Sequence, residues 1–291
     1  MEGSLRVNLM TWWRGATGRA PRPRGARITR VEMTDDEPPI KPPDYRIVAA
    51  LRSDVGCHRR VNEDCCHYSE PDEAAGKGAL AIVADGMGGH AAGEVASRMA
   101  VEIVNRLYYA GADGAPATLE KAFREANRMI HKAAQSNARL SGMGTTCTAL
   151  ALRNGFAVCA HIGDSRLYLV RNGAIYLMSE DHSAVMELVR RGVLSRETAR
   201  GHADRNIILR ALGTRPEADA TIWQAPFPVR ADDCFVLCSD GLSDPVTDEE
   251  IKQAVLSAEP AEACEQLIAL AKERGGHDNI TVGALKIVAS E

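Results

Sequence analysis

Two Asn-Gly dipeptides, Asn154-Gly155 and Asn172-Gly173, each join two apolar runs, and they constrain the fold more than any other feature of the sequence. A two-residue hairpin turn of type I′ needs positive φ angles at both central positions, which Asn and Gly adopt at little cost. Residues 145–178 are therefore predicted to form an antiparallel meander. This pattern differs from the strand–helix–strand units that build a parallel sheet.

The sequence around the hairpins alternates between short strand patterns and pairs of helix patterns. Further strands are expected at 45–51, 78–85, 233–240 and 279–288. Apolar residues recur every three or four positions over 95–107 and over 119–133, which predicts two consecutive helices. Two more helices are expected after Thr247 and Glu259. The predicted fold class is α+β, with layered antiparallel sheets covered by helices.

Residues 183–215 break this pattern. The segment is polar and rich in arginine, and its helical pieces are short. We expect it to be an insertion that lies outside the core.

The chain has 291 residues and a formal net charge of −4, so its overall charge favours neither nucleic acid nor an anionic membrane as a partner. No run of about 18 apolar residues occurs, which argues against a transmembrane helix. The N-terminal region has no apolar stretch followed by a cleavage site, so no secretory signal is expected. These features are typical of a cytoplasmic protein.

The eight cysteines form no C-x-x-C pair, and most of them lie in apolar, strand-like runs. This spacing argues against a zinc site and against a disulfide framework. Buried free thiols in a reducing compartment are the expected state.

The first 43 residues differ in composition from the rest of the chain. Residues 1–30 hold seven arginines against one acidic residue, and 31–43 add acidic residues and four prolines. We expect a disordered tail ahead of a domain over 44–291. Two alternatives are a true start at Met33 and a basic arm that docks a partner. Without residues 1–43 the domain carries 27 basic and 34 acidic residues, a net charge of −7.

Acidic residues stand at the ends of several predicted strands. They are Asp85, Asp164, Asp240 and Asp278, with Glu63 and Asp64 ahead of another strand. Carboxylates that meet at one sheet edge repel and raise one another's pKa unless cations neutralise them. An all-oxygen set favours magnesium or manganese over zinc. Histidines such as His90, His182 and His277 lack the i, i+4 zinc spacing, and we expect them at the surface or behind the ligands.

A glycine-rich turn follows Asp85, with glycines at 86, 88 and 89. One interpretation is an ordinary Asp-Gly turn between a strand and a helix. The other is that Asp85 is a ligand and the glycines let the backbone approach an ion or a phosphate.

Seven stretches occur in the order seen in metal-dependent, type 2C (PPM) serine/threonine protein phosphatases. They are RRVNED, VADGMGGHAAGEVAS, MGTTCTA, HIGDSRLYLVRNG, SEDHS, LCSDGLSD and HDNITV. The chain most resembles the compact bacterial members of this family, over residues 45–288. The resemblance implies a four-layer αββα sandwich of two antiparallel sheets flanked by helix pairs, with 183–215 as a flap beside the active site.

The resemblance also implies a set of metal ligands. Asp85 matches the aspartate that bridges two Mn²⁺ or Mg²⁺ ions, and the Gly86 carbonyl and Glu63 match ligands of one of them. Asp240 and Asp278 match ligands of the other ion. Asp164, with Asp240, matches a third, weaker metal site. Asp64 and Asn279 are expected to orient waters and ligands from behind.

The implied reaction is hydrolysis of phosphoserine and phosphothreonine in proteins by a metal-activated water. Arg59 matches the arginine that binds the substrate phosphate, although the neighbouring Arg60 is an alternative. Met87 stands where many eukaryotic relatives have a histidine proposed as general acid, so the proton donor to the leaving group is not identified. The implied partners are phosphorylated proteins, including a bacterial serine/threonine kinase and its targets, and we expect a cytoplasmic monomer.

Two other interpretations compete with this one. An inactive homologue or phosphate-binding module would lack one or more ligands, yet Glu63, Asp85, Asp240 and Asp278 are all present. A nucleotide-binding loop of the Walker type needs G-K-[ST], which the turn after Asp85 lacks.

Overall fold

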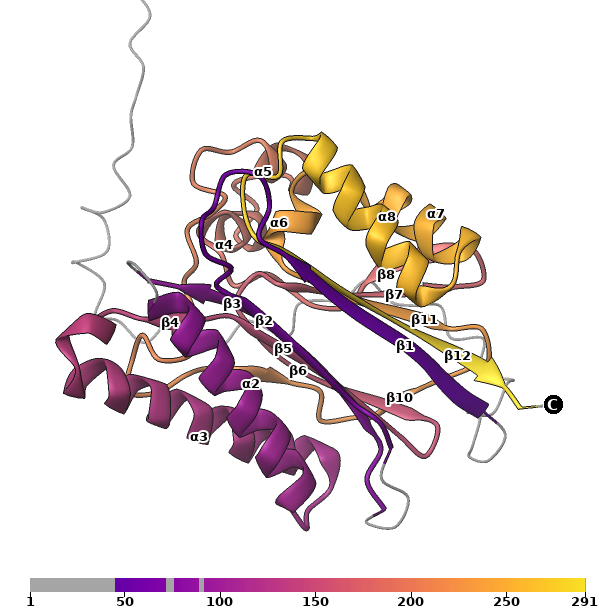
Figure 1. Ribbon diagram of the computed structural model, residues 1–291, viewed down its shortest axis with the longest axis horizontal. Helices are drawn as coiled ribbons and strands as arrows, with labels where there is room; N and C mark the ends of the chain where they lie inside the picture. Colours follow the sequence, from indigo (N-terminus) through magenta and orange to yellow (C-terminus); the bar gives the residue numbers. More distant parts are fainter. Residues whose placement is uncertain (1–44, 72–75, 89–91, 291) are drawn as a thin grey trace, which may run out of the picture. The chain divides into compact units, whose positions relative to one another are not determined.

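The computed structural model describes residues 45–71, 76–88 and 92–290, which contain two antiparallel sheets and two pairs of longer helices (Figure 1). The tail expected over 1–43 lies outside the described residues, as do Gly89 and His90 of the turn after Asp85. No helix in the described ranges is both long enough and apolar enough to cross a bilayer.

The first sheet has five strands in the order β1-β12-β11-β7-β8. Their bounds are β1 Tyr45–Asp54, β7 Arg166–Arg171, β8 Ala174–Leu177, β11 Cys234–Cys238 and β12 Ile280–Ala289. The longest pairing joins β1 to β12, from Tyr45 opposite Ala289 to Asp54 opposite Ile280. These strands confirm those expected near 45–51, 233–240 and 279–288.

The second sheet has the order β10-β6-β5-β3-β2, with β4 paired to β3 and β9 paired to β6. The bounds are β2 Asp64–Ser69, β3 Ala79–Met87, β4 Gly144–Thr145, β5 Cys147–Arg153, β6 Phe156–Ile162, β9 Thr221–Ile222 and β10 Phe227–Pro228. Apolar side chains of both sheets, such as Val83 and Leu150 from one and Phe235 and Leu285 from the other, form a shared buried cluster. The two sheets therefore pack face to face.

Both predicted hairpins are present. The φ angles are 52° and 78° at Asn154 and Gly155, and 52° and 73° at Asn172 and Gly173. A continuous meander over 145–178, however, is wrong, because β6 belongs to the second sheet and β7 to the first. The chain crosses between the sheets at Gly163, which has a φ of 110° and whose added Cβ would lie 2.5 Å from the Thr146 side chain.

Helix pairs cover the outer faces of the two sheets (Figure 1). α2 (Ala92–Ala110) and α3 (Ala115–Ser136) pack on the second sheet, while α7 (Asp248–Ser257) and α8 (Pro260–Glu273) pack on the first. The helices expected after Thr247 and Glu259 are present as α7 and α8. The structure adds a capping box of Thr247 and Glu250 at the start of α7. The fold is thus the predicted α+β, four-layer αββα sandwich.

The segment 183–215 holds two short helices, α4 (Ala184–Arg190) and α5 (Arg196–Arg200). Most of its side chains are exposed or half-buried, but its C-terminal part enters the core. Leu212 is fully buried and exchanges two backbone hydrogen bonds with Thr145. The expectation that the whole segment lies outside the core is therefore wrong at this end.

The eight cysteines are all free. Five are buried, Cys65 and Cys66 are half-buried and Cys57 is exposed. Burial raises the pKa of Cys66, Cys234 and Cys238 to about 12, so these thiols remain protonated at neutral pH.

Candidate active site

The predicted acidic residues gather at one end of the stacked sheets. Asp85 lies near the end of β3, Asp164 follows β6, Asp278 precedes β12, and Asp240 begins the short helix α6 (Asp240–Ser243) after β11. Burial raises the pKa of Asp85, and the negative charges of Asp64, Asp240, Asp164 and Asp278 raise it further. Residues from four separate parts of the sequence thus repel one another in one place.

Asp64 and Asp85 are directly opposite each other in the β2–β3 ladder. Two like charges at such a cross-strand position destabilise a sheet. Burial and the charges of Asp240 and Asp278 raise the pKa of Asp64 to about 7, although hydrogen bonds to Asp64 oppose this rise. Burial likewise raises the pKa of Asp240 to about 6, although a hydrogen bond with the Asp85 side chain opposes that rise.

Four buried carboxylate oxygens at this end have no hydrogen-bond partner in the described structure. They are Glu63 Oε1, Asp64 Oδ1, Asp164 Oδ1 and Asp240 Oδ1. An anionic oxygen buried without a donor is costly unless a cation approaches it. No three His, Cys, Asp or Glu side chains among the described residues already form a cage, so the carboxylates would have to rotate toward an ion. Their chemistry fits a hard divalent cation such as Mn²⁺ or Mg²⁺.

Two threonines of the MGTTCTA stretch hold the backbone of Asp85. The Asp85 N–H donates to Thr146 Oγ1 at 2.9 Å, and the Thr145 hydroxyl donates to the Asp85 carbonyl at 2.8 Å. Thr146 Oγ1 also lies 2.7 Å from Ser165 Oγ, in the residue after Asp164. Thr146 therefore connects the backbones that carry Asp85 and Asp164. Nothing in the MGTTCTA stretch itself indicates this role for Thr146.

Gly86 permits a close approach of three chain segments. Its N–H donates to the Glu63 carbonyl at 3.1 Å. A Cβ added to Gly86 would lie 2.1 Å from the Gly93 carbonyl oxygen in α2 and 2.5 Å from that of Glu63. The glycine is thus required to seat the start of α2 against the carboxylate cluster, beyond forming an ordinary turn.

Asp64 joins the two sheets. Its Oδ2 accepts from the Ser239 hydroxyl at 2.8 Å and from the Thr281 hydroxyl at 2.7 Å. Ser239 is the residue before Asp240, and Thr281 belongs to β12. A buried Asp64 therefore positions elements that carry Asp85, Asp240 and Asp278.

Asn279 fixes the loop that leads to Glu63. Its side-chain oxygen accepts from the Glu63 N–H at 2.8 Å, and its Nδ2 donates to the carbonyls of Val55 and Val61 at 3.0 Å. The loop between these carbonyls contains Arg59. Asn279 thus sets the backbone on which that arginine stands.

The two candidate arginines differ in their surroundings. Arg59 Nη2 donates to Asp278 Oδ2 at 2.8 Å, and the charges of Asp278, Glu63 and Asp85 act on its guanidinium. Arg60 is exposed and forms no ion pair with the residues that the structure describes. Of these two arginines, Arg59 is the one that contacts the carboxylate cluster.

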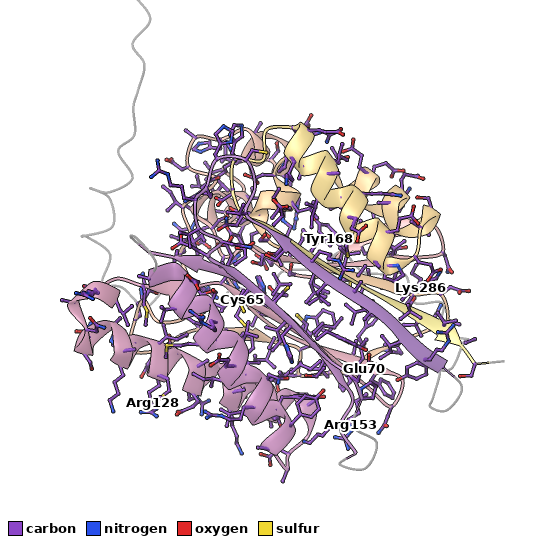
Figure 2. All side chains as sticks on the ribbon, in the orientation of Figure 1. Cys65, Glu70, Arg128, Arg153, Tyr168 and Lys286 are labelled. Atoms are coloured by element: carbon purple, nitrogen blue, oxygen red, sulfur yellow. The ribbon has the colours of Figure 1, made fainter. Side chains whose placement is uncertain are left out.

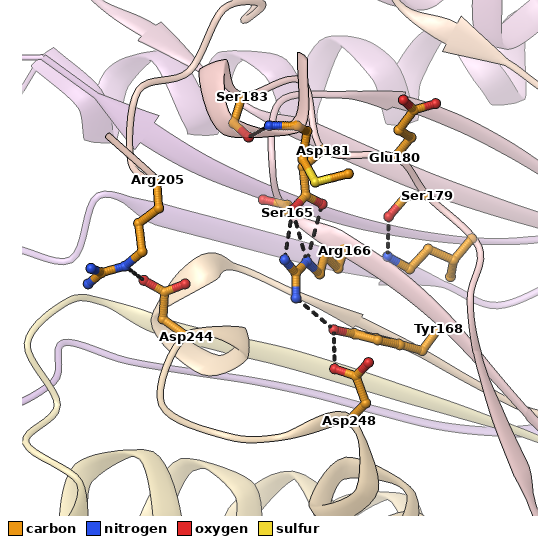
Figure 3. A network of polar contacts seen from close by, with 12 residues as sticks. Ser165, Arg166, Tyr168, Ser179, Glu180, Asp181, Ser183, Arg205, Asp244 and Asp248 are labelled. Carbon is orange, nitrogen blue, oxygen red and sulfur yellow. Dashed lines mark hydrogen bonds and ion pairs between the residues drawn. The ribbon is translucent and has the colours of Figure 1, made fainter. Parts of the chain in front are cut away.

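A second network is built around Arg166, two residues after Asp164 in the sequence (Figure 3). Arg166 donates three hydrogen bonds to the buried Asp181, at 2.7–3.2 Å, and one to the Tyr168 hydroxyl. Tyr168 in turn donates to Asp248 at 3.3 Å. This network ties β7 to α7 and to the loop before α4. Arg166 and Asp181 come from the GDSR and SEDHS stretches, but nothing in the spacing of these stretches indicated that the two residues pair.

His182 connects the same region to residues 183–215. Its backbone N–H donates to the Gly163 carbonyl at 2.7 Å, and its ring Nδ1 accepts from the Gly163 N–H at 3.2 Å. Nε2 faces Thr221 Oγ1 at 3.2 Å, and the ring lies 4.9 Å from that of His161. His182 is buried behind Asp164, and His277 is exposed.

Comparison with known proteins supports one family. A family model for protein phosphatase 2C matches residues 58–274. The serine/threonine phosphatase stp of Listeria innocua is 39% identical over 240 residues, 80% of this chain and 93% of that protein. The serine/threonine protein phosphatase PstP of Mycobacterium tuberculosis is 42% identical over 245 residues, 82% of this chain and 45% of that protein.

Solved structures agree. The crystal structure of Mycobacterium tuberculosis PstP has a TM-score of 0.75 and 40% identity, covering 83% of this chain and 99% of that one. The catalytic domain of PstP in complex with two manganese ions has a TM-score of 0.71 and 39% identity, covering 84% of this chain and 100% of that one. This chain therefore belongs to the protein phosphatase 2C family, the metal-dependent serine/threonine protein phosphatases.

Proposed function

We propose that Glu63, Asp85, Asp240 and Asp278 hold two divalent ions in this phosphatase, with Asp85 between them and the Gly86 carbonyl on the ion beside Glu63. The observation that carries the proposal is the set of buried carboxylate oxygens without donors, on residues that repel one another. Asp164, whose Oδ1 is among them, completes a third site with Asp240. When bound, the ions lower the pKa of a water molecule and neutralise charge on the substrate phosphate.

Arg59 binds the phosphate oxygens of the substrate. Its guanidinium is half-exposed and lies 2.8 Å from Asp278, so it can turn from the carboxylate to an incoming phosphate without leaving the site. A planar guanidinium can donate two parallel hydrogen bonds to a phosphate, which orients the phosphorus for attack. The Met87 side chain carries no exchangeable proton and cannot protonate the leaving alkoxide.

The substrates are phosphoserine and phosphothreonine in proteins, including targets of a serine/threonine kinase in the same cytoplasm, and the enzyme acts as a monomer. The domain's charge of −7 gives no general attraction to acidic phosphoproteins, so selection depends on local contacts. Residues 183–215 are the flap beside the site, because His182 and Leu212 attach the segment to the supports of Asp164 and Asp85. We infer that this flap contributes those contacts.

A phosphatase assay tests the proposal directly. The chain should hydrolyse p-nitrophenyl phosphate and a phosphothreonine peptide in Mn²⁺ or Mg²⁺, and excess chelator should stop both reactions. A phosphotyrosine peptide of the same sequence should be a poor substrate. Full activity in chelator, or recovery with zinc alone, would contradict the two-ion site.

A further inference from the structure

The segment 205–212 runs along the supports of the carboxylate cluster. At one end, Arg205 Nε donates to Asp244 Oδ2 at 3.2 Å (Figure 3). Asp244 is one turn beyond Asp240, whose carbonyl accepts from the Asp244 N–H at 2.8 Å. This end of the segment is therefore fixed to the helix that begins with Asp240.

The rest of the segment is fixed to two further supports. The Leu209 N–H donates to the His182 carbonyl at 2.7 Å, and His182 is bonded to Gly163, next to Asp164. Leu212 pairs with Thr145, whose hydroxyl donates to the Asp85 carbonyl. The segment consequently borders the elements that carry all three aspartates.

The same segment exposes apolar side chains. Ile207 is 46% exposed and Leu209 is 41% exposed. Only three other large apolar side chains among the described residues are exposed, namely Val61, Val193 and Leu256. Val61 is two residues from Arg59, and Val193 follows α4. Four of the five thus lie in the flap or the arginine loop, which is a concentration that single, scattered surface residues would not produce.

The cations of the segment are already paired. Arg205 contacts Asp244, and Arg210 Nη1 lies 3.1 Å from Asp219 Oδ2. The surface between them therefore offers apolar area and few free positive charges. This chemistry suits an apolar side chain better than an acidic one.

We propose that residues 205–212, here named the apolar ledge, dock the polypeptide on one side of the phosphorylated residue and favour an apolar side chain there. The inference rests on the proposed function and specifies its substrate. An extended peptide advances about 3.3 Å per residue, so side chains within roughly four residues of the phosphate can reach a neighbouring surface. Burying half of an Ile or Leu side chain contributes enough for about a fivefold gain in kcat/KM.

The test uses the full chain with Mn²⁺ and phosphothreonine peptides in a serine background. A single leucine is moved through the four positions on each side of the phosphothreonine, and one further peptide set carries aspartate instead. We expect kcat/KM to rise about fivefold at one or two leucine positions on one side only. An equal kcat/KM for leucine at every position, or a larger rise in kcat/KM with aspartate than with leucine, would contradict the proposal that the apolar ledge binds an apolar side chain.

Variants then locate the contact. Leu209→Gln and Ile207→Thr should reduce the leucine gain to within twofold, because each replaces apolar surface with a polar group. Leu256→Gln is the matched control, because this 53% exposed leucine lies on α7, and it should keep the wild-type gain. An equal loss in the control would remove the assignment to the ledge.

Two readouts keep the outcomes separate. If the wild-type chain hydrolyses p-nitrophenyl phosphate with Mn²⁺ but shows a flat leucine profile, the ledge fails and the phosphatase function stands. If it hydrolyses neither substrate, the proposed function fails. The profile of the wild-type chain decides the question even where a variant does not fold.

Discussion

The Arg59 guanidinium and the Asp278 carboxylate form an ion pair at 2.8 Å, and both side chains are half-exposed to solvent. Exposed pairs contribute only about 0–1 kcal/mol, so a substrate phosphate or a cation can replace either partner. The pair therefore holds two proposed functional groups side by side before either is used. Asn279, adjacent to Asp278, fixes the loop on which Arg59 stands.

Removing the Arg59 side chain should impair substrate binding more than metal binding. We expect Arg59→Ala to lower kcat/KM by about ten- to more than a hundredfold, the equivalent of a charge-assisted contact of about 1.5–3 kcal/mol. Manganese affinity should change little, because Arg59 holds no metal. Steady-state kinetics and a manganese titration measure both quantities.

Arg60→Ala is the matched control for this prediction. Its side chain is exposed and forms no ion pair with the described residues, so its loss should cost less than threefold. A larger loss for Arg60→Ala than for Arg59→Ala would show that the phosphate is bound by the other arginine.

Asp85→Asn should separate activity from stability. The amide removes one charge from a cluster in which Asp64, Asp240, Asp164 and Asp278 repel it, so the metal-free protein should become more stable by about 1–3 kcal/mol. Turnover should disappear, since the proposed bridging ligand is lost. Thermal melts in chelator and in Mn²⁺, with an activity assay, test both effects. A variant that is less stable without metal, or that keeps near-wild-type turnover, contradicts this reading of the cluster.

Thr146 should act by positioning Asp85. Thr146→Val keeps the shape of the side chain but removes the acceptor for the Asp85 N–H and the partner of Ser165. Leaving a buried donor unsatisfied costs about 1–3 kcal/mol of stability. We also expect Thr146→Val to lower kcat and weaken Mn²⁺ binding, while KM changes less. Thr146→Ser should restore most of the kcat and most of the Mn²⁺ affinity. An unchanged manganese titration in the valine variant would limit Thr146 to a purely structural role.

The predictable parts of the fold were those that local chemistry determines. Asn-Gly turns and helical periodicity act within a few residues, and the turns and helices that they predict are present. The passage from β6 to β7 was missed because both arms look alike in sequence. Which sheet a strand joins depends on long-range packing, such as the contact of Gly163 with Thr146.

The site shows the same division. Aspartates at strand ends could be identified from the sequence, and the structure brings them together. Their supports could not, because Thr146, Ser239 and His182 act through partners 19 to 175 residues away. Figure 2 shows how densely such side chains fill the space between the ribbons. A polar residue in a strand pattern does not reveal which distant hydrogen bond it will make.

Buried His182 should make the protein sensitive to acid. Burial, reinforced by His161, Arg210 and Arg190, lowers its pKa from 6.5 to about 2. Between these values the unfolded chain binds a proton that the folded protein does not, so stability falls as the pH drops below 6.5. At pH 5 the free energy of unfolding is about 2 kcal/mol lower than at pH 8. This loss is set by the His182 pKa of 6.5 in the unfolded chain, because pH 5 is still far above the pKa of His182 in the folded protein.

The carboxylate cluster acts in the opposite direction. Asp64, with a folded pKa of about 7, and Asp240, with one of about 6, bind protons in the folded protein first, and this stabilises it as the pH falls. The difference between wild type and His182→Asn therefore isolates the histidine, because the asparagine oxygen can still accept from the Gly163 N–H but does not titrate. Urea unfolding at pH 8, 6 and 5 measures this difference. Between pH 8 and pH 5 the free energy of unfolding should fall by about 2 kcal/mol more for the wild type than for His182→Asn. Parallel curves for the two proteins would mean that His182 is protonated, or accessible to water, in the folded state.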